Sequence, residues 1–419
     1  MALWTVHGDG RRVTDGAAVA PDERLSWPLT IGFGVQHSAA MFGATILVPV
    51  ATGFPPTTAL LFSGLGTLLF LLITRNRVPA YVGSSFAFIA PLVAARENGI
   101  AAQLGGVLAA GMLLVVVGIA VKALGARLLE SLMPPAVAGA VVTLVGLNNL
   151  AKAATVAPQR QPGLAMVTLA VILVCGLLGR GLLARVCVLV GVLAGWTLAA
   201  MAGEIDPVRV QAMSEAALVG LPQLVSPQIQ PAVVLTVLPV VVVLVAENVG
   251  HVKATASVIG RNLDGSVGDV LIANGLSTAL AGFGGGPGTT TRAENIGVMT
   301  VTKVYSTATY AVAAVAAIVL SFSPKIDALL ATMPSGVLEG ATLLLYGLIA
   351  LVGARIWIEG KVDLLNPVNM LAAAAALVAG VGNLTVRLGG LDFGGIAWGT
   401  LFIVTAHPLL RAMYAARRR

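Results

Sequence analysis

GGGPGTTTRAENIGVMTVTK, from Gly284 to Lys303, changes midway from loop-forming to helix-forming sequence. Its first half is rich in glycine and in β-branched threonine, which disfavour a regular helix. Its second half is apolar, and Glu294 stands at the junction. A carboxylate is stabilised there by the exposed N–H groups of a helix start, so capping is one explanation for it. The stretch predicts an interrupted apolar segment with an acidic residue at the break.

The composition places this stretch in a membrane. The 419 residues are 57% hydrophobic and 10% charged, and the mean hydropathy is +0.94. Soluble domains carry about 25% charged residues, so this chain cannot cover a water-facing surface. Apolar runs of about 17 to 25 residues, the length of a membrane-crossing helix, recur along most of the chain. The roughly ten-residue alternating segments of a β-barrel are not seen. We expect an all-α protein that crosses the bilayer many times.

The apolar runs predict about fourteen transmembrane segments. They lie near 30–51, 57–74, 80–95, 101–121, 132–150, 163–179, 184–202, 232–253, 267–282, 287–303, 306–322, 335–353, 363–382 and 395–413.

The net charge of +7 is distributed as a topology signal. With the N-terminus inside, most Lys and Arg fall on the cytoplasmic side, as the positive-inside rule requires. We therefore expect both termini in the cytoplasm and no nucleic-acid partner. The basic residues on that side include Arg75, Arg77, Lys122, Arg127, Arg180, Arg185, Arg261, Arg355, Lys361, Arg417, Arg418 and Arg419.

Several function classes find no support in the sequence. Residues 1–27 are polar and do not resemble a cleavable signal. Cys175 and Cys187 lie in apolar runs, so we expect no disulfide. A phosphate-binding GxxxxGK[ST] loop, a metal-ligand cluster and a nucleophile–base pair are all missing from the sequence. We expect a secondary or passive transporter, with no catalytic residues, no metal and no cofactor.

The two halves of the chain resemble each other, as in transporters built from inverted repeats. LMPPAVAGAVVTLVGL (132–147) resembles TMPSGVLEGATLLLYGL (332–348), with Met133 aligned to Met333. GLGTLL (64–69) resembles GLSTAL (275–280) at a similar separation. Each half holds about seven predicted spans, and with an odd number the second half must run upside down.

Two predicted spans look interrupted, and they are the third of one half and the corresponding tenth of the other. PAYVGSSFAFIAP (79–91) is too short between its prolines to cross as a helix, and GGGPGTTTRAENIG (284–297) has too many glycines and threonines. Non-helical backbone survives at membrane depth only where it lines a cavity or is packed in protein. Such a pair is the best sequence indication of a transporter's binding site.

Ionisable residues inside the predicted spans are few and costly, at about 2.5 to 3.5 kcal/mol each at a helix centre. Glu247 and His251 are four residues apart and share a helix face. We expect Glu247 and Glu294 to face one cavity, one binding substrate N–H donors and one exchanging a proton. His251 would hydrogen-bond a substrate carbonyl or the neighbouring carboxylate. Further candidates are His37, Arg292 and Glu339.

AENIGVMTVTK (293–303) resembles the signature of the nucleobase/ascorbate transporter family: Gln, Glu or Pro, then Asn, any residue, Gly, four residues, Thr, and a basic residue or Gly. The matching residues are Glu294, Asn295, Gly297, Thr302 and Lys303. Between about residues 30 and 410, further segments resemble the family's bacterial uracil:proton symporters. They are QHSAAMFGATILVP (36–49), PAYVGSSFAFIAP (79–91), AENVGH (246–251), GRNLDG (260–265) and GLSTALAGFGG (275–285).

The resemblance implies two inverted seven-span repeats, with a short strand in the third and in the tenth span. It also implies a core domain that moves against a gate domain, and often a homodimer through the gate. In this chain the parts would be a cytoplasmic segment (1–29), the core (30–125 and 232–323), the gate (126–205 and 324–414), an external linker (206–231) and a basic tail (415–419).

Carried over residue by residue, Glu247 and Glu294 match the carboxylates that hold the uracil ring. His251 matches a histidine of the proton network, which includes both carboxylates. Phe86 and Ala293 lie where the backbone meets the base. Arg292, Asn295 and His37 are candidate modulators. Family members selective for xanthine or uric acid tend to carry Gln at the Glu294 position, so Glu favours uracil.

Two residues depart from the family pattern. Relatives usually carry an aromatic residue at the position of Arg292, whose guanidinium either points away from Glu294 or pairs with it. Pairing would weaken proton coupling or admit a more anionic substrate. Relatives tend to have Gly at the position of Glu339, whose carboxyl could hydrogen-bond across the gate.

The sequence thus predicts a proton-coupled importer of a nucleobase, uracil, in a bacterial inner membrane. One alternative is a xanthine or uric acid permease of the same family. Another is an anion exchanger of the sulfate/bicarbonate type, which Arg292 favours and the Glu–Asn–x–Gly signature opposes. A channel is the third, although it would need no buried carboxylate pair to couple two fluxes.

Overall fold

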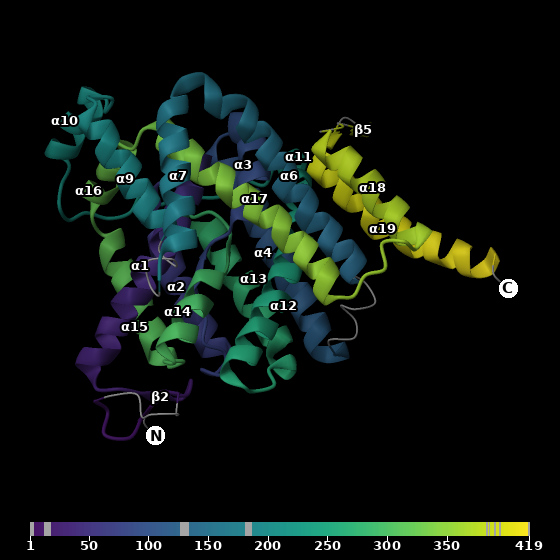
Figure 1. Ribbon diagram of the computed structural model, residues 1–419, viewed down its shortest axis with the longest axis horizontal. Coiled ribbons are helices and arrows are strands. Elements are labelled where there is room, and N and C mark those ends of the chain that lie inside the picture. The colour runs from purple at the N-terminus through teal and green to yellow at the C-terminus, as the bar shows by residue number, and fades with distance from the viewer. Residues whose placement is uncertain are drawn as a thin grey trace.

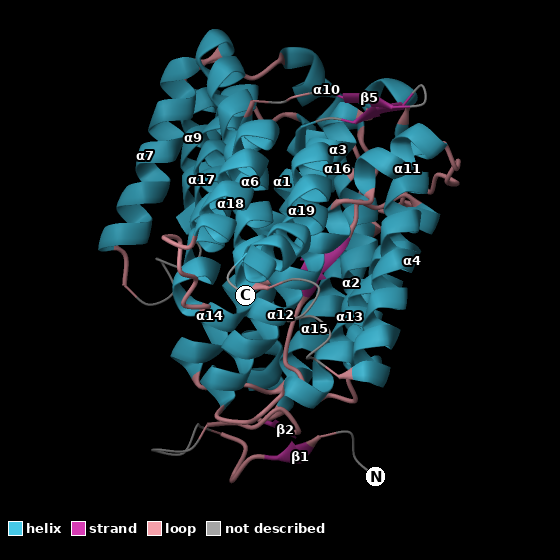
Figure 2. Ribbon diagram, turned by 90° about the vertical axis from the view of Figure 1, so that its right-hand side faces the viewer, coloured by secondary structure: helices cyan, strands magenta, loops and turns pink. Residues whose placement is uncertain are grey.

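The computed structural model describes residues 4–11, 18–125, 134–180, 187–382, 384, 386–388, 391–393 and 395–417. Most of these residues lie in helices that run between two opposite ends of the molecule (Figure 1, Figure 2). The first half contains α1 (Trp27–Thr52), α2 (Pro56–Ile73), α3 (Ile89–Ala94), α4 (Ile100–Leu124), α6 (Pro135–Arg160), α7 (Pro162–Leu178) and α9 (Cys187–Met201).

The second half follows residues 206–231, which contain α10 (Pro207–Glu215). Its helices are α11 (Pro231–Val237), α12 (Val240–Ile259), α13 (Val267–Gly284), α14 (Ala293–Thr302), α15 (Thr307–Ser321), α16 (Pro324–Ala331), α17 (Ser335–Glu359), α18 (Pro367–Val381) and α19 (Gly395–Arg417). Short 3-10 turns are η1 (Phe86–Phe88), η2 (Arg96–Asn98) and η3 (Asp264–Ser266). The strands are β1 (Thr5–Val6), β2 (Glu23–Arg24), β3 (Val82–Ser84), β4 (Thr289–Thr291), β5 (Val386–Leu388) and β6 (Leu391–Phe393).

Among the described residues, 6 helical segments are long and apolar enough to cross a bilayer, and the bent pair α15–α16 would be one more. The six are Trp27–Thr52, Pro56–Ile73, Ile100–Leu124, Pro231–Ile259, Asp264–Gly284 and Ser335–Glu359. Shorter apolar helices occupy Pro135–Asn148, Pro162–Leu178, Cys187–Met201 and Pro367–Val381. The predicted helical membrane fold is confirmed, while the number of fourteen crossings stays a prediction.

Most predicted spans coincide with helices, the spans at 80–95 and 287–303 begin with the strands β3 and β4, and one span needs a correction. The span expected at 232–253 is two helices, α11 and α12, that meet at Pro239, and the second continues to Ile259. Proline has no backbone N–H and its ring clashes with the preceding turn, so a continuous helix is interrupted there. Of the basic and repeat residues singled out in the sequence, Arg127, Met133, Arg185, Arg418 and Arg419 lie outside the described residues.

The sequence segments that resemble each other come together in the structure. Ser277 of GLSTAL, on α13, donates a 3.1 Å hydrogen bond to the carbonyl of Gly66 in GLGTLL, on α2. The other matched pair, on α6 and α17, packs along its length, and Trp357 Nε1 bonds to the Ala136 carbonyl at 3.1 Å. Corresponding elements of the two halves therefore meet each other, as a common two-fold axis requires.

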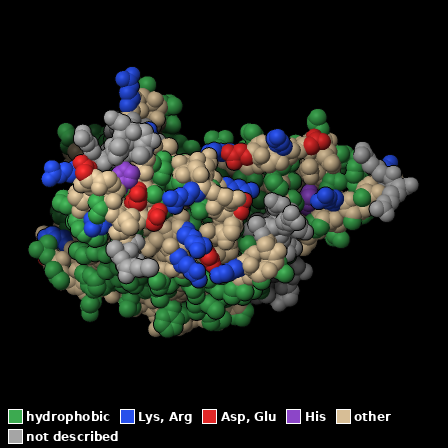
Figure 3. Space-filling view, turned by 90° about the horizontal axis from the view of Figure 1, so that it is seen from below, with side chains coloured by type: hydrophobic (Ala, Val, Ile, Leu, Met, Phe, Trp, Pro, Cys, Tyr) green, Lys and Arg blue, Asp and Glu red, His purple; other side chains and the backbone are tan. Residues whose placement is uncertain are grey.

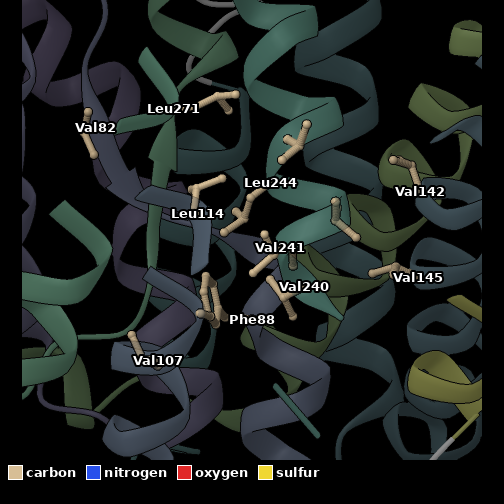
Figure 4. Close-up of a cluster of buried hydrophobic side chains, with 14 of the residues drawn as sticks. Val82, Phe88, Val107, Leu114, Val142, Val145, Val240, Val241, Leu244 and Leu271 are labelled. Carbon is tan, nitrogen blue, oxygen red and sulfur yellow. The ribbon is translucent and has the colours of Figure 1, made fainter. Parts of the chain in front are cut away.

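Helix α12 lies in the middle of the packed interior (Figure 4). Its apolar side chains join one buried cluster with those of α4, α13 and α6. The members labelled in the close-up include Val240, Val241 and Leu244 of α12, Leu114 of α4, Leu271 of α13, and Val142 and Val145 of α6. This packing fixes the helix that carries Glu247 and His251.

The described part of the N-terminal segment folds back onto the helices. β1 and β2 pair in parallel, and Val19 forms a bridge with Val304, between α14 and α15. Trp4 Nε1 donates to Thr307 Oγ1 at 2.7 Å, and Arg261 lies 3.4 Å from Asp22. This segment lies at one end of the molecule, opposite α10 and β5 (Figure 2).

Candidate functional site

The two interrupted segments meet as a two-stranded antiparallel sheet. β3 and β4 pair with Val82 opposite Thr291, Gly83 opposite Thr290 and Ser84 opposite Thr289. All six residues are buried. Because the strands satisfy each other's backbone groups, non-helical chain can lie at this depth. The predicted breaks in the third and tenth spans, each with a short strand, are confirmed.

Two threonines from the repeated sequence motifs hold the strands in equivalent ways. Thr67 Oγ1 accepts from the Val82 N–H at 3.0 Å, and its single hydrogen is shared between the Val82 carbonyl at 3.2 Å and the Ser63 carbonyl at 2.8 Å. Thr278 Oγ1 accepts from the Thr289 N–H at 3.1 Å and donates to the Thr289 carbonyl at 3.0 Å. Thr67 belongs to GLGTLL and Thr278 to GLSTAL, so the repeat seen in the sequence places each strand.

A short helix begins directly after each strand. Phe86 opens η1, where the Ser85 hydroxyl accepts from the Ala87 N–H at 3.3 Å. Ala293 opens α14, and Glu294 lies in its first turn, as the sequence predicted. The first N–H groups of such helices have no partner within the helix and can donate to a ligand.

Glu247 connects α12 to the first interrupted segment. Ser85 Oγ lies 3.4 Å from Glu247 Oε2 and donates to it. Glu247 and Glu294 are both partly exposed, and their negative charges act on each other. The arrangement places two carboxylates beside the paired strands, one on each of two helices.

Arg292 is a buried cation at the junction of β4 and α14, with only 3% of its surface exposed. Its backbone N–H bonds to the Tyr81 carbonyl at 2.9 Å, and its guanidinium bonds to the Ser84 carbonyl. The guanidinium also lies over the Phe86 ring, 5.1 Å from the centroid.

The sequence left open whether the Arg292 guanidinium points away from Glu294 or pairs with it. The structure shows neither extreme. Within the described residues its guanidinium forms no direct ion pair, but its positive charge acts on both Glu294 and Glu247. Arg292 therefore ties the two interrupted segments together while balancing charge at the carboxylates.

His251 is linked to β4 through side chains that the sequence reading overlooked. His251 Nδ1 lies 2.8 Å from Thr291 Oγ1, which donates to Asn248 Oδ1 at 3.0 Å. Asn274 Nδ2 of α13 also donates to Asn248 Oδ1, at 2.6 Å. The sequence did not single out Ser85, Thr291, Asn248 and Asn274, because uncharged hydroxyls and amides are common in apolar helices and charges are rare. Asn248 could have been found, since it is one helical turn from both Leu244 and His251.

His37 and Asn295 form a separate buried contact between α1 and α14. Asn295 Nδ2 donates to the His37 carbonyl at 3.1 Å and lies 3.0 Å from His37 Nδ1. The His37 ring also stacks on Tyr310, with centroids 4.4 Å apart. These two candidate modulators brace the helix that carries Glu294.

Glu339 lies on α17. Its neighbour Gly340 packs closely on the Ala165 backbone of α7. The structure thus brings Phe86, Glu247, His251, Arg292 and Glu294 around the strands by direct contacts or charge interactions.

Comparison with solved structures shows the fold. SLC26A9 matches with a TM-score of 0.65 at 11% identity, covering 92% of this chain and 65% of that chain. The transmembrane domain of the cyanobacterial bicarbonate transporter BicA matches with a TM-score of 0.56 at 15% identity, covering 84% and 94%. The chain has the same inverted-repeat fold as these proteins.

Comparison with curated sequences shows the family. A protein of Escherichia coli (strain K12) that bears the name "Putative pyrimidine permease RutG" is 43% identical over 410 residues, covering 95% of this chain and 93% of its own. The uracil permease of the same organism is 39% identical, covering 92% of each chain. The uracil permease of Bacillus subtilis (strain 168) is 34% identical, covering 92% and 93%. A family model described as "Permease family" matches residues 29–389. The chain therefore belongs to this permease family and is a multi-pass membrane transporter rather than an enzyme.

Proposed function

We propose that this permease carries a nucleobase, uracil, into the cell together with a proton. The observation that carries the proposal is the position of Glu247 and Glu294 beside the paired strands, with the Ser85 hydroxyl on Glu247. The names of the curated relatives, uracil and pyrimidine permeases, support the same substrate class.

The chemistry of uracil fits these groups. The ring presents two N–H donors, two carbonyl acceptors and a flat apolar face. Carboxylates accept from the N–H groups, and charged acceptors make the stronger hydrogen bonds. The backbone N–H groups at the starts of η1 and α14, near Phe86 and Ala293, supply donors for the carbonyls.

The charge balance gives a reason for proton coupling. Two carboxylates, Glu247 and Glu294, and one guanidinium, Arg292, act on one another at this site, which leaves one net negative charge when His251 is neutral. An uncompensated charge inside a protein is costly. A neutral base that arrives with one proton brings this group of residues to neutrality, so we assign the coupling to Glu247, Glu294 and His251.

The movement would occur between a core (30–125 and 232–323) and a gate (126–205 and 324–414). One apolar cluster joins the two, from Ile46 and Leu47 of α1 to Val192 of α9 and Val337 of α17. Apolar side chains make no directional bonds with each other, so this part of the contact can slide at low cost. Thr57 of α2 donates to Asp327 of α16 through its N–H and its hydroxyl, and these bonds join the core and the gate at another point. We further propose a homodimer through the gate, with 206–231 as the linker between repeats.

The orientation follows from the basic residues. Lys and Arg side chains gather on the face that carries the N-terminal segment (Figure 3). Lys303, Arg261 and Lys122 lie at the ends of α14, α12 and α4, and Arg261 contacts the N-terminal segment itself. We propose that this face is cytoplasmic, that both termini lie there, and that the membrane is a bacterial inner membrane.

An anion exchanger is the second candidate, because Arg292 is a buried cation close to the site. The likeness to SLC26A9 and BicA, at 11% and 15% identity, concerns the fold alone. Two carboxylates beside the same strands would repel a free anion. A xanthine or uric acid permease of the same family is distinguished from a uracil permease by which unlabelled base competes for uptake.

Uptake of labelled uracil into proteoliposomes under an inward proton gradient tests the proposal. We expect accumulation that a protonophore abolishes, and a loss of about tenfold or more in Glu247→Gln and Glu294→Gln, since a hydrogen bond to a charged group is worth about 1.5 to 3 kcal/mol. The control is Glu97→Gln, at an exposed position in η2. If unlabelled xanthine or bicarbonate inhibits uptake and unlabelled uracil does not, the substrate is a purine or an anion and the uracil assignment is wrong. Uracil uptake that does not depend on the proton gradient would contradict proton coupling.

A further inference from the structure

The side chains behind His251 determine which of its ring nitrogens carries a hydrogen. Asn248 Nδ2 donates to the Leu244 carbonyl at 2.7 Å. A carbonyl accepts only, so the amide nitrogen must face Leu244 and Asn248 Oδ1 must face the other way. That oxygen receives Asn274 Nδ2 at 2.6 Å, and Asn274 Nδ2 is itself oriented by the Val270 carbonyl at 3.2 Å. Both asparagines are fully buried, with 0% exposure.

The orientation of Asn248 fixes the direction of the hydrogen bond between Thr291 and His251. Its hydroxyl has one hydrogen, and Asn248 Oδ1, 3.0 Å away, has none to give. Thr291 therefore donates to Asn248 and must accept from His251 Nδ1, at 2.8 Å. A ring nitrogen donates only when it is protonated. His251 Nδ1 thus carries the hydrogen, and in the neutral ring the lone pair is on Nε2.

His37 provides an internal contrast, because its contacts require the opposite tautomer. Asn295 Nδ2 faces the His37 carbonyl at 3.1 Å, which fixes the amide nitrogen on this side. The same nitrogen lies 3.0 Å from His37 Nδ1, so Nδ1 accepts and Nε2 carries the hydrogen. His37 and His251 are therefore expected to differ in tautomer.

We propose that Asn248, Asn274 and Thr291 are positioning residues that hold His251 in the Nδ1–H tautomer and present Nε2 as the base for the transported proton. A proton that binds Nε2 leaves the bond from Nδ1 to Thr291 in place, and the proton leaves from the same atom. Exchange is thereby confined to one side of the ring, and the buried relay does not rearrange during the cycle.

The charged groups around His251 are those of the proposed substrate site. Glu247 lies one turn earlier on α12, the charge of Arg292 acts on the His251 ring, and Glu294 follows Arg292 on α14. The role given to Nε2 rests on the proposed proton symport. The tautomer itself follows from the hydrogen bonds alone.

Solid-state NMR of histidine-labelled protein in lipid bilayers tests the tautomer directly. The chain has 4 histidines, and His251→Gln and His37→Gln identify two of the signals by their loss. Above the ordinary histidine pKa of about 6.5, we expect the Nδ1–H form for His251 and the Nε2–H form for His37. An Nε2–H form at His251 in the wild-type protein overturns the proposal, even if uptake is normal.

Threonine variants test the positioning role. Thr291→Val removes the acceptor at nearly constant shape, so we expect His251 to lose its single tautomer and the pH profile of uptake to change. Thr291→Ser restores the hydroxyl and should restore both. The matched control is Thr300→Val, since Thr300 is exposed and its hydroxyl donates to the Ile296 carbonyl of its own helix.

Two further outcomes separate this inference from the function on which it rests. If His251 keeps the Nδ1–H tautomer in Thr291→Val, the positioning role of Thr291, Asn248 and Asn274 is wrong. A wild-type protein with the Nδ1–H form at His251 that transports no uracil overturns the proposed function and leaves the tautomer assignment standing.

Discussion

The first interrupted segment, residues 82–94, and the second, residues 289–302, share a backbone plan and differ in chemistry. Each begins with a three-residue strand, and the strands pair with each other. Each strand is bonded at its first residue by an equivalent threonine, Thr67 or Thr278. After the strands the likeness ends: α3 has 6 residues and α14 has 10.

Charge is confined to the second segment. When the strands are aligned from their first residues, Ser85 corresponds to Arg292, Phe86 to Ala293, and Ala87 to Glu294. The first segment therefore contributes a hydroxyl and an aromatic ring, and the second contributes a cation and a carboxylate. An inverted repeat duplicates the scaffold, but an asymmetric ligand needs different groups on its two sides. The repeat therefore accounts for the paired strands, and the residues that follow each strand make the two sides of the site chemically different.

The shared scaffold predicts nearly equal effects of two substitutions, Thr67→Val and Thr278→Val. Each leaves the N–H of one buried strand residue without its side-chain partner. The Thr289 carbonyl also loses the Thr278 hydroxyl, whereas the Val82 carbonyl still accepts from Ser63 Oγ at 2.6 Å. We expect a loss of about 1 to 3 kcal/mol in the free energy of unfolding for each, because unpaired buried polar groups are costly. Thermal melting in detergent measures it. The control Thr405→Val removes an exposed hydroxyl on α19. A large effect in only one strand would break the comparison.

The difference in charge predicts the behaviour of Arg292→Gln. Glutamine retains a donor for the Ser84 carbonyl but removes the positive charge that acts on Glu247 and Glu294. Without that cation, protonation of a nearby carboxylate becomes easier. We expect the pH midpoint of uptake to move upward by about 1 unit. The pH profile of uptake in proteoliposomes measures the shift, with Arg209→Gln on exposed α10 as the control. An unchanged midpoint would show that Arg292 acts only as a structural link.

The smallest effect concerns the N-terminal segment, which contacts the chain just after the second interrupted segment. Burial alone would raise the pKa of Glu23, but bonds from the Ala20 N–H and His7 outweigh burial and hold the pKa below its ordinary 4.5. A lowered pKa means that the ionised form stabilises the fold. That stabilisation is present above pH 4.5 and is lost as pH falls through the folded-state pKa.

We therefore expect residues 4–11 and 18–26 to lose protection from proteolysis at acid pH before the helices unfold, with a contribution of about 1 kcal/mol. Glu23→Gln should remove most of this pH dependence. The control Glu215→Gln leaves the N-terminal contacts intact, since Glu215 bonds to Gln211 on exposed α10. Acid-insensitive protection in the wild-type protein would contradict this assignment.

Much of the site could be found from the sequence because charges and breaks are rare in apolar helices. The pattern TTTRAEN predicted both the break and the position of Glu294 in the first turn of α14. The spacing of Glu247 and His251 predicted that they share a helix. Asn248 and Asn274 were not predicted, because their role depends on a contact between α12 and α13 that no local pattern encodes.

By itself the sequence determined the helical membrane fold, the two interruptions, the internal repeat and the family. These follow from composition, helix length and local backbone preference, which act over a few residues to a few tens of residues. Only the tertiary structure decided that Val82 lies opposite Thr291, that Arg292 bonds to Ser84, and that Thr291 bonds to His251. Each of these contacts joins residues at least forty positions apart, and its geometry is set by how whole helices pack.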